Sequence, residues 1–118
     1  EVELDGGWTM TLVLALSYGG RAEIVRAAQA LVKAACEGEL KAHEVTEESF
    51  RRALGSGHLP DADLVIRTGG EHRLSNLLLW HAAYAEVVSP EVYWPDFDGD
   101  AMRQAISTCR SQERRFGR

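Results

Sequence analysis

Residues 63–76 have the sequence DLVIRTGGEHRLSN, in which a short apolar run leads into a glycine turn and then into polar residues. The apolar run is rich in β-branched side chains and is bounded by charged residues, a pattern typical of a buried strand. Gly69 and Gly70 allow the backbone to turn sharply directly after it. The stretch therefore predicts a strand over residues 63–67 that ends at Arg67.

Patterns on both sides of this stretch predict alternating strands and helices. The β-branched, nearly uncharged run over residues 9–18 predicts a strand covered on both faces, and residues 86–88 predict another short strand. Helices are expected over residues 21–36, 47–54 (with Thr46 as N-cap), 76–83 and 100–116. This order predicts an α/β fold with a mainly parallel sheet and helices on both faces, in a single domain over residues 1–118.

Two of the expected helices carry apolar residues at intervals of three and four, so each predicts one buried face. In the helix over residues 21–36 this face consists of Ile24, Ala28, Leu31, Val32 and Ala35. In the helix over residues 100–116 it consists of Met102, Ala105, Ile106 and Cys109. Gly38 is expected to end the first of these helices.

Composition and charge exclude several classes of function. Hydrophobic residues make up 45% of the 118 residues and charged residues 26%, which indicates a globular rather than a disordered chain. The net charge of −5 gives no electrostatic footprint for nonspecific nucleic-acid binding. Cysteines and histidines lack zinc-ligand spacing, and neither a GxSxG motif nor a P-loop occurs. The longest apolar run, residues 12–16, is too short to span a bilayer. The two cysteines, Cys36 and Cys109, favour a reduced compartment. We expect a cytoplasmic protein with at most peripheral membrane contact.

The turn after the expected strand over residues 63–67 is a candidate anion site. Arg67, Arg73 and Ser75 follow one another closely there, and Asn76 stands where the next helix is expected to begin. Guanidinium forks, hydroxyl groups and helix N-termini all bind phosphate oxygens. These residues predict a diphosphate clamp, and the alternative is a solvated loop that ends in a helix cap.

Two further positions each have two interpretations. Gly19 and Gly20 join the run over residues 9–18 to the next helix, where free backbone N–H groups bind an anion or the turn is an ordinary tight connection. Glu86 is a lone acid in an apolar stretch, and it either pairs with an arginine or holds a divalent cation bound to phosphate oxygens. The residue pattern by itself leaves both alternatives open.

Three blocks of the sequence resemble the cis-prenyltransferase family. They are LALSYGGRAEIVRAA over residues 14–28, DLVIRTGGEHRLSNLLLWHAAYAEVVSPEVYWPDFD over residues 63–98, and ERRFG over residues 113–117. The blocks occur in the order and spacing of the family and cover most of residues 12–117. The resemblance implies an enzyme that condenses isopentenyl diphosphate onto an allylic diphosphate with cis geometry, using Mg²⁺ and releasing pyrophosphate.

The resemblance also implies roles for individual residues. Arg67, Arg73 and Ser75 match positions that bind the diphosphate of isopentenyl diphosphate. Glu86 matches an acidic residue that assists magnesium binding. No residue of this chain is assigned the chemical step itself.

A partner subunit is implied as well. Arg115 and Gly117 match an Arg-x-Gly ending that in the family reaches towards the isopentenyl diphosphate of the partner in a homodimer or heterodimer. The region from Asn76 to Val88 matches the dimer interface, so the apolar residues 77–80 are expected to be buried against a second subunit.

The resemblance does not extend to the N-terminal half of the family. That half carries an Asp-Gly-Asn-Gly-Arg-type loop for the allylic diphosphate and magnesium, and helices that line the product tunnel, and neither has a counterpart in this sequence. Because the sequence starts at Glu1 rather than at a methionine, one interpretation is the C-terminal part of a cis-prenyltransferase whose remaining part is absent or supplied by another chain, inactive by itself. The alternative is a catalytically silent partner subunit, and the intact arginines of the clamp favour the first.

Overall fold

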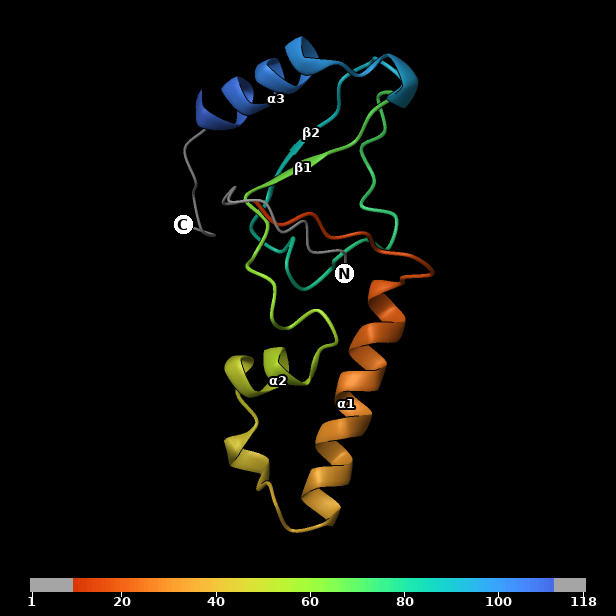
Figure 1. The fold of residues 1–118 in the computed structure, drawn as a ribbon. Helices are drawn as coiled ribbons and strands as arrows, with labels where there is room; N and C mark the ends of the chain where they lie inside the picture. Colours follow the sequence, from red (N-terminus) through yellow and green to blue (C-terminus); the bar gives the residue numbers. More distant parts are fainter. Residues whose placement is uncertain (1–9, 112–118) are drawn as a thin grey trace.

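The computed structural model describes residues 10–111 (Figure 1), and expectations for residues 1–9 and 112–118 lie outside the described residues. The elements are α1 (Gly20–Cys36), the 3-10 helix η1 (Ala42–Glu44), α2 (Glu47–Ala53), β1 (Leu64–Ile66), β2 (Glu86–Val88), the 3-10 helix η2 (Trp94–Asp96) and α3 (Gly99–Ser111). Strands and helices share one chain and the strands are parallel, so the predicted α/β class is confirmed.

The two described strands form a parallel pair. Their register places Leu64 opposite Glu86, Val65 opposite Val87 and Ile66 opposite Val88, so both short strands predicted from the sequence are confirmed. Helix α3 packs against both strands, and α1 packs against α2. Figure 1 shows the α1–α2 pair and α3 at opposite ends of the molecule, with the strands between them. The strand pair thus lies between the α1–α2 pair and α3.

Helix α1 begins at Gly20, one residue before the predicted start, and ends at Cys36 as predicted. Its many alanines favour the helical backbone, and Gly38 follows its end with a φ of +77°, which confirms the predicted stop. The buried face, however, is not the predicted apolar stripe. Its fully buried residues are Gly20, Glu23 and Ala27, whereas Val32 is 62% exposed.

The rotation of this face has a physical cause. Ile24 and Leu31 are half-buried beside the buried face, while Ala28 and Ala35 are exposed. Glu23 takes a buried position because hydrogen bonds from two other segments satisfy its carboxylate, as described below. Polar contacts therefore determined which side of α1 faces inward, and apolar periodicity did not.

Residues 10–18 are extended but do not form the predicted strand. Met10 and Leu16 are 81% and 84% exposed, and Ser17 has a φ of +51°. A strand is stabilised by its ladder and by side chains on neighbouring strands. Within residues 10–111, β1 and β2 pair only with each other, so this segment has no described ladder to join.

Residues 76–83 form a series of turns instead of the predicted helix. Ser75, Asn76 and Leu78 have positive φ values of +49°, +67° and +41°, which a right-handed helix does not allow. Trp80 in this segment stacks on Phe50 with ring centroids 4.8 Å apart. The apolar run that suggested a helix is thus half-buried within the same chain.

The two remaining predicted helices are confirmed within the described residues. Helix α2 has Thr46 as its N-cap, whose Oγ1 accepts a 3.1 Å hydrogen bond from Ser49 N. In α3, Ala105 is buried and Cys109 half-buried, but Met102 and Ile106 are 43% and 38% exposed, so only part of the predicted face is covered. No helix within residues 10–111 has the length and apolar character needed to cross a membrane.

Candidate functional site

The backbone after β1 is hydrogen-bonded to the end of β2 and to the residues that follow it. Arg67 N donates to Val88 O at 2.9 Å, Gly69 N to Val92 O at 2.9 Å, and Gly70 N to Pro90 O at 3.0 Å. Gly69 and Gly70 both have φ values in the left-handed region, which glycine adopts readily. The predicted sharp turn is therefore confirmed. Arg67 lies where the backbone after β1 is hydrogen-bonded to the end of β2.

The two turn glycines are required by conformation and by space. The φ value is +74° at Gly69 and +67° at Gly70. A Cβ atom on Gly69 would lie 3.2 Å from the Tyr93 ring, and one on Gly70 would lie 3.0 Å from the Glu91 carboxylate. Ser89 Oγ also donates to Glu71 O at 2.8 Å. The loop after β1 is therefore packed closely against residues 89–93.

Arg67 and Ser75, two of the predicted site residues, are brought together by this loop. Arg67 Nη2 donates a 3.2 Å hydrogen bond to Ser75 Oγ. Among the described residues, Nε of Arg67 is a buried side-chain atom without a hydrogen-bond partner. Buried donors are nearly always paired, so an unpaired one requires an explanation. An anion beside Arg67 and Ser75 would supply the missing acceptor.

Arg73 lies on the same loop, and its side chain is exposed to solvent. Arg73 precedes Ser75 by two residues, so a second arginine lies close in sequence to the Arg67–Ser75 pair. The common action of Arg67 and Arg73 on one ligand stays a prediction. Arg115 and Gly117 lie outside the described residues.

Glu86 lies at the other end of the sheet from Arg67. It begins β2 opposite Leu64, whereas Arg67 follows the last residue of β1. Three residues along a strand correspond to about 10 Å. Glu86 takes part in an interaction within the chain, and its predicted role toward a cation is untested.

A magnesium ion fits these residues only together with a phosphate ligand. Within residues 10–111, no group of three or more histidine, cysteine or acidic side chains could hold a metal ion. Magnesium is commonly bound through one or two carboxylates plus substrate phosphates and waters. The donor set is therefore compatible with Glu86 as a single carboxylate ligand, and it does not provide a complete protein cage.

Two backbone N–H groups at the start of α1 already donate hydrogen bonds within the chain, so they are not available to an anion. Gly20 N donates to Asn76 O, and Arg21 N donates to Asn76 Oδ1, both at 2.8 Å. A Cβ on Gly19 would lie 3.0 Å from Asn76 Nδ2, and one on Gly20 would lie 2.9 Å from Leu79 Cγ. The glycine pair therefore permits close approach of residues 76–79. Of the two interpretations of the Gly19–Gly20 turn, an anion site and an ordinary tight connection, the structure fits the tight connection.

Sequence reasoning missed a buried polar network behind the loop. Tyr18 Oη donates to Glu23 Oε2 at 2.6 Å, and Ser56 N donates to Glu23 Oε1 at 2.7 Å. Ser56 Oγ lies 2.8 Å from His81 Nε2, and His81 Nδ1 lies 3.2 Å from Asp61 Oδ1. Glu23 and His81 are only 4% and 2% exposed. The buried carboxylate of Glu23 thus accepts hydrogen bonds from Tyr18 and Ser56. The buried ring of His81 has Ser56 and Asp61 as its partners.

The network sets the protonation of two of its members. Burial, the hydrogen bond to Glu23 and the charge of Glu23 together raise the pKa of Tyr18 to about 12. Burial alone would raise the pKa of Glu23, but the hydrogen bonds from Tyr18 and Ser56 and the attraction of His81 hold it below its ordinary value. Glu23 is thus kept as a carboxylate. Only its place in the first turn of a helix could be read from the sequence.

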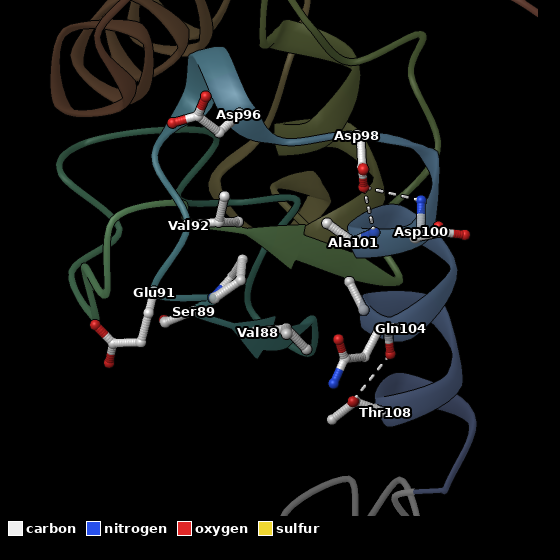
Figure 2. Close-up of a pocket in the computed structure, with 12 residues that line it drawn as sticks. Val88, Ser89, Glu91, Val92, Asp96, Asp98, Asp100, Ala101, Gln104 and Thr108 are labelled. Atoms are coloured by element: carbon white, nitrogen blue, oxygen red, sulfur yellow. Dashed lines mark hydrogen bonds between the residues drawn. The ribbon is translucent and has the colours of Figure 1, made fainter.

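A pocket of about 530 Å³ lies between residues 88–92 and α3, and Figure 2 shows the residues that line it. Its lining includes the carboxylates of Glu91, Asp96, Asp98 and Asp100. Asp98 caps α3, because its Oδ1 accepts hydrogen bonds from Asp100 N at 3.0 Å and Ala101 N at 2.9 Å. Carboxylates repel an anion such as diphosphate. The candidate anion site is therefore the loop over residues 67–75 and not this pocket.

Comparison with known proteins places this loop in a family of prenyl-transferring enzymes. A family model described as "Putative undecaprenyl diphosphate synthase" matches residues 3–117. The chain belongs to this family, the cis-prenyltransferases. The resemblance noted in the sequence is confirmed.

Individual relatives agree with this assignment. The chain is 45% identical over 118 residues to a farnesyl-diphosphate-specific undecaprenyl-diphosphate synthase from Pseudomonas syringae pv. tomato, covering 100% of this chain and 47% of that protein. It is 46% identical over 107 residues to a geranylgeranyl-diphosphate-specific enzyme from Thermoplasma acidophilum, covering 91% of this chain and 42% of that protein. The chain spans about half the length of the curated relatives it matches.

A solved structure has the same fold. Lavandulyl diphosphate synthase from Lavandula x intermedia, crystallised in complex with dimethylallyl diphosphate, matches with a TM-score of 0.83 and 33% identity. The match covers 87% of this chain and 44% of that protein. The α/β arrangement described above is therefore that of a cis-prenyltransferase.

Proposed function

We propose that this chain binds the diphosphate group of isopentenyl diphosphate through Arg67, Arg73 and Ser75. The observation that carries the proposal is the buried Nε of Arg67, which has no hydrogen-bond partner in the described part of the chain, beside the Arg67–Ser75 hydrogen bond. Hydrogen bonds from a guanidinium to a phosphate are charge-assisted and directional. A diphosphate would accept the unused donor and would be held at the end of β1.

The chain would contribute this site to a cis-prenyltransferase. The relatives named above share similar identity with the chain, although one is specific for farnesyl diphosphate and the other for geranylgeranyl diphosphate. A segment that is equally similar to both supports a role toward the substrate that the two reactions have in common. In that reaction the allylic C–O bond breaks and diphosphate leaves, the double bond of isopentenyl diphosphate bonds to the allylic carbon, and a proton is lost from the isopentenyl unit to restore a double bond.

The residues of this chain would position one reactant. Arg67, Arg73 and Ser75 would fix the isopentenyl diphosphate so that its double bond meets the allylic carbon, which replaces a bimolecular encounter by an oriented one. Glu86 would provide a carboxylate for Mg²⁺, which supplies charge neutralisation for diphosphate oxygens when bound. Arg115 and Gly117 would act on the isopentenyl diphosphate of a partner subunit.

The partner and the location are part of the same proposal. The region from Asn76 to Val88 would meet a second subunit, and Tyr84 and Val87 in it are 67% and 38% exposed. Residues 1–118 would act as one domain in a cytoplasmic enzyme that contacts membranes through its lipid product. A catalytically silent partner subunit is the second candidate.

A complementation assay tests the proposed function. The chain is incubated with farnesyl diphosphate, labelled isopentenyl diphosphate and Mg²⁺, alone and together with the remaining part of the Pseudomonas syringae relative. We expect labelled product only in the mixture. Product from the chain alone would contradict the expected inactivity of the isolated chain. A mixture that stays inactive although the two polypeptides form a complex would favour the silent partner.

A further inference from the structure

The segment that follows the candidate diphosphate loop is held by hydrogen bonds at two places. At its start, Asn76 accepts hydrogen bonds from Gly20 N and Arg21 N at 2.8 Å each. Near its end, His81 O accepts a 2.9 Å hydrogen bond from Ala62 N, two residues before β1. The segment consists of turns and is not stabilised by the regular backbone hydrogen bonds of a helix. Its position is therefore set by these distant contacts.

Asn76 is suited to this task by its conformation. Its φ of +67° lies in the left-handed region, which asparagine tolerates better than most residues. In this conformation both its main-chain and its side-chain oxygens reach the first two N–H groups of α1. These N–H groups have no partner inside the helix. One residue thus caps a helix that lies 55 residues away in sequence.

The capping contact is directly continuous with the diphosphate site. Ser75 precedes Asn76, and its Oγ accepts the hydrogen bond from Arg67 Nη2. Ser75 also has a positive φ, +49°, which serine does not favour. A backbone conformation of this kind persists only where its surroundings enforce it. The contact between Asn76 and α1, on the next residue of the chain, is one such constraint.

We propose that Asn76 is a positioning residue that fixes Ser75 within reach of Arg67 by anchoring the loop to the first turn of α1. This inference rests on the proposed function, because it assigns Asn76 a role in the same diphosphate site. Asn76 would not need to touch the ligand. It would raise affinity by holding the clamp in its binding conformation before the ligand arrives.

The test uses Asn76→Gly, which removes the side-chain acceptor and keeps a residue suited to positive φ. Ser17→Gly is the matched control, because Ser17 is an exposed residue with a φ of +51° in the segment before α1. Asn76→Asp keeps the acceptor. Gly19→Ala disturbs the same contact from the other side, since its Cβ would lie 3.0 Å from Asn76 Nδ2. It therefore serves if Asn76→Gly does not fold.

Two quantities are measured on each folded variant. Hydrogen exchange of the Arg21 amide reports the contact with Asn76. Titration with inorganic pyrophosphate, followed by the ¹⁵N resonance of Arg67 Nε and by calorimetry, reports the site. We expect Asn76→Gly to lose protection of the Arg21 amide and to bind pyrophosphate about two- to tenfold more weakly, the effect of one neutral hydrogen bond. Ser17→Gly should match the wild type, and Asn76→Asp should keep the protection.

Other results overturn the inference. Loss of Arg21 protection with unchanged pyrophosphate affinity would make Asn76 a helix cap only. Unchanged Arg21 protection in Asn76→Gly would show that the contact does not hold the loop. Absence of pyrophosphate binding to the wild type, with no shift of the Arg67 Nε resonance, would instead overturn the proposed function and remove the basis of the inference.

Discussion

Arg67 Nη2 donates a 3.2 Å hydrogen bond to Ser75 Oγ, and this contact joins the end of β1 to the segment anchored on α1. The hydroxyl orients the guanidinium at one nitrogen, while the buried Nε has no acceptor among residues 10–111. An oriented guanidinium with an unused donor is already arranged for an oxyanion. The account of this chain as a diphosphate-binding part depends on this pair.

Arg73→Ala should weaken binding of isopentenyl diphosphate without weakening the fold. Arg73 is exposed, so its removal leaves no buried group unpaired. Hydrogen bonds to charged groups contribute about 1.5–3 kcal/mol, which corresponds to about a tenfold to hundredfold loss of affinity. Calorimetric titration measures it. Arg52→Ala on α2 is the control, and equal affinities of the two variants would remove Arg73 from the site.

Ser56→Ala should destabilise the protein, although it removes only one hydroxyl group. His81 is 2% exposed, and Ser56 Oγ lies 2.8 Å from its Nε2. A buried polar group left without a partner costs about 1–3 kcal/mol. The free energy of unfolding in urea measures the loss. Ser107→Ala, at an exposed position of α3, is the matched control; if both variants are equally stable, the network has no structural role.

Stability should fall at alkaline pH because of Tyr18. Burial and the contact with Glu23 raise its folded pKa from 10.0 to about 12, so the folded state favours the neutral phenol. This contribution is complete below pH 10 and is lost as the pH rises through about 12. Urea unfolding across this range should show a decline that Tyr18→Phe reduces. An identical pH dependence in both proteins would contradict the assignment.

Arg115 is expected to act on the site of a partner subunit. If so, an Arg115→Ala chain and an Arg67→Ala chain combine into a mixed dimer with one intact site. Turnover of the co-refolded mixture, with the remaining part of the enzyme supplied, should exceed that of either variant alone. A mixture that performs no better than the average of its parents, despite verified mixed dimers, would place the action of Arg115 elsewhere.

Local sequence patterns were sufficient for some elements. Short β-branched runs bounded by turns predicted both strands, and the glycine turn after Arg67 was predicted together with its sharp change of direction. Thr46 predicted the start of α2 because the cap contact is made within four residues. In each case the deciding interactions lie close together in the sequence.

Other elements depend on contacts between distant residues. The apolar run over residues 76–83 has a helical pattern, but the capping of α1 by Asn76 requires a backbone that a helix does not allow. The buried face of α1 follows Glu23, whose partners Tyr18 and Ser56 come from other segments. A single sequence does not reveal such partners. The predicted strand over residues 9–18 likewise needs a neighbouring strand that the described residues do not provide.

Binding of isopentenyl diphosphate to the wild-type chain, compared with Arg67→Ala and Arg67→Lys by calorimetry, tests the central claim most directly. Lysine keeps the charge but lacks the planar fork of donors, so it separates geometry from charge. We predict binding by the wild type, a loss of about tenfold to hundredfold in Arg67→Ala, and a smaller loss in Arg67→Lys. Equal affinity of all three proteins, or no binding by a folded wild type, would contradict the claim that Arg67 is the core of a diphosphate site.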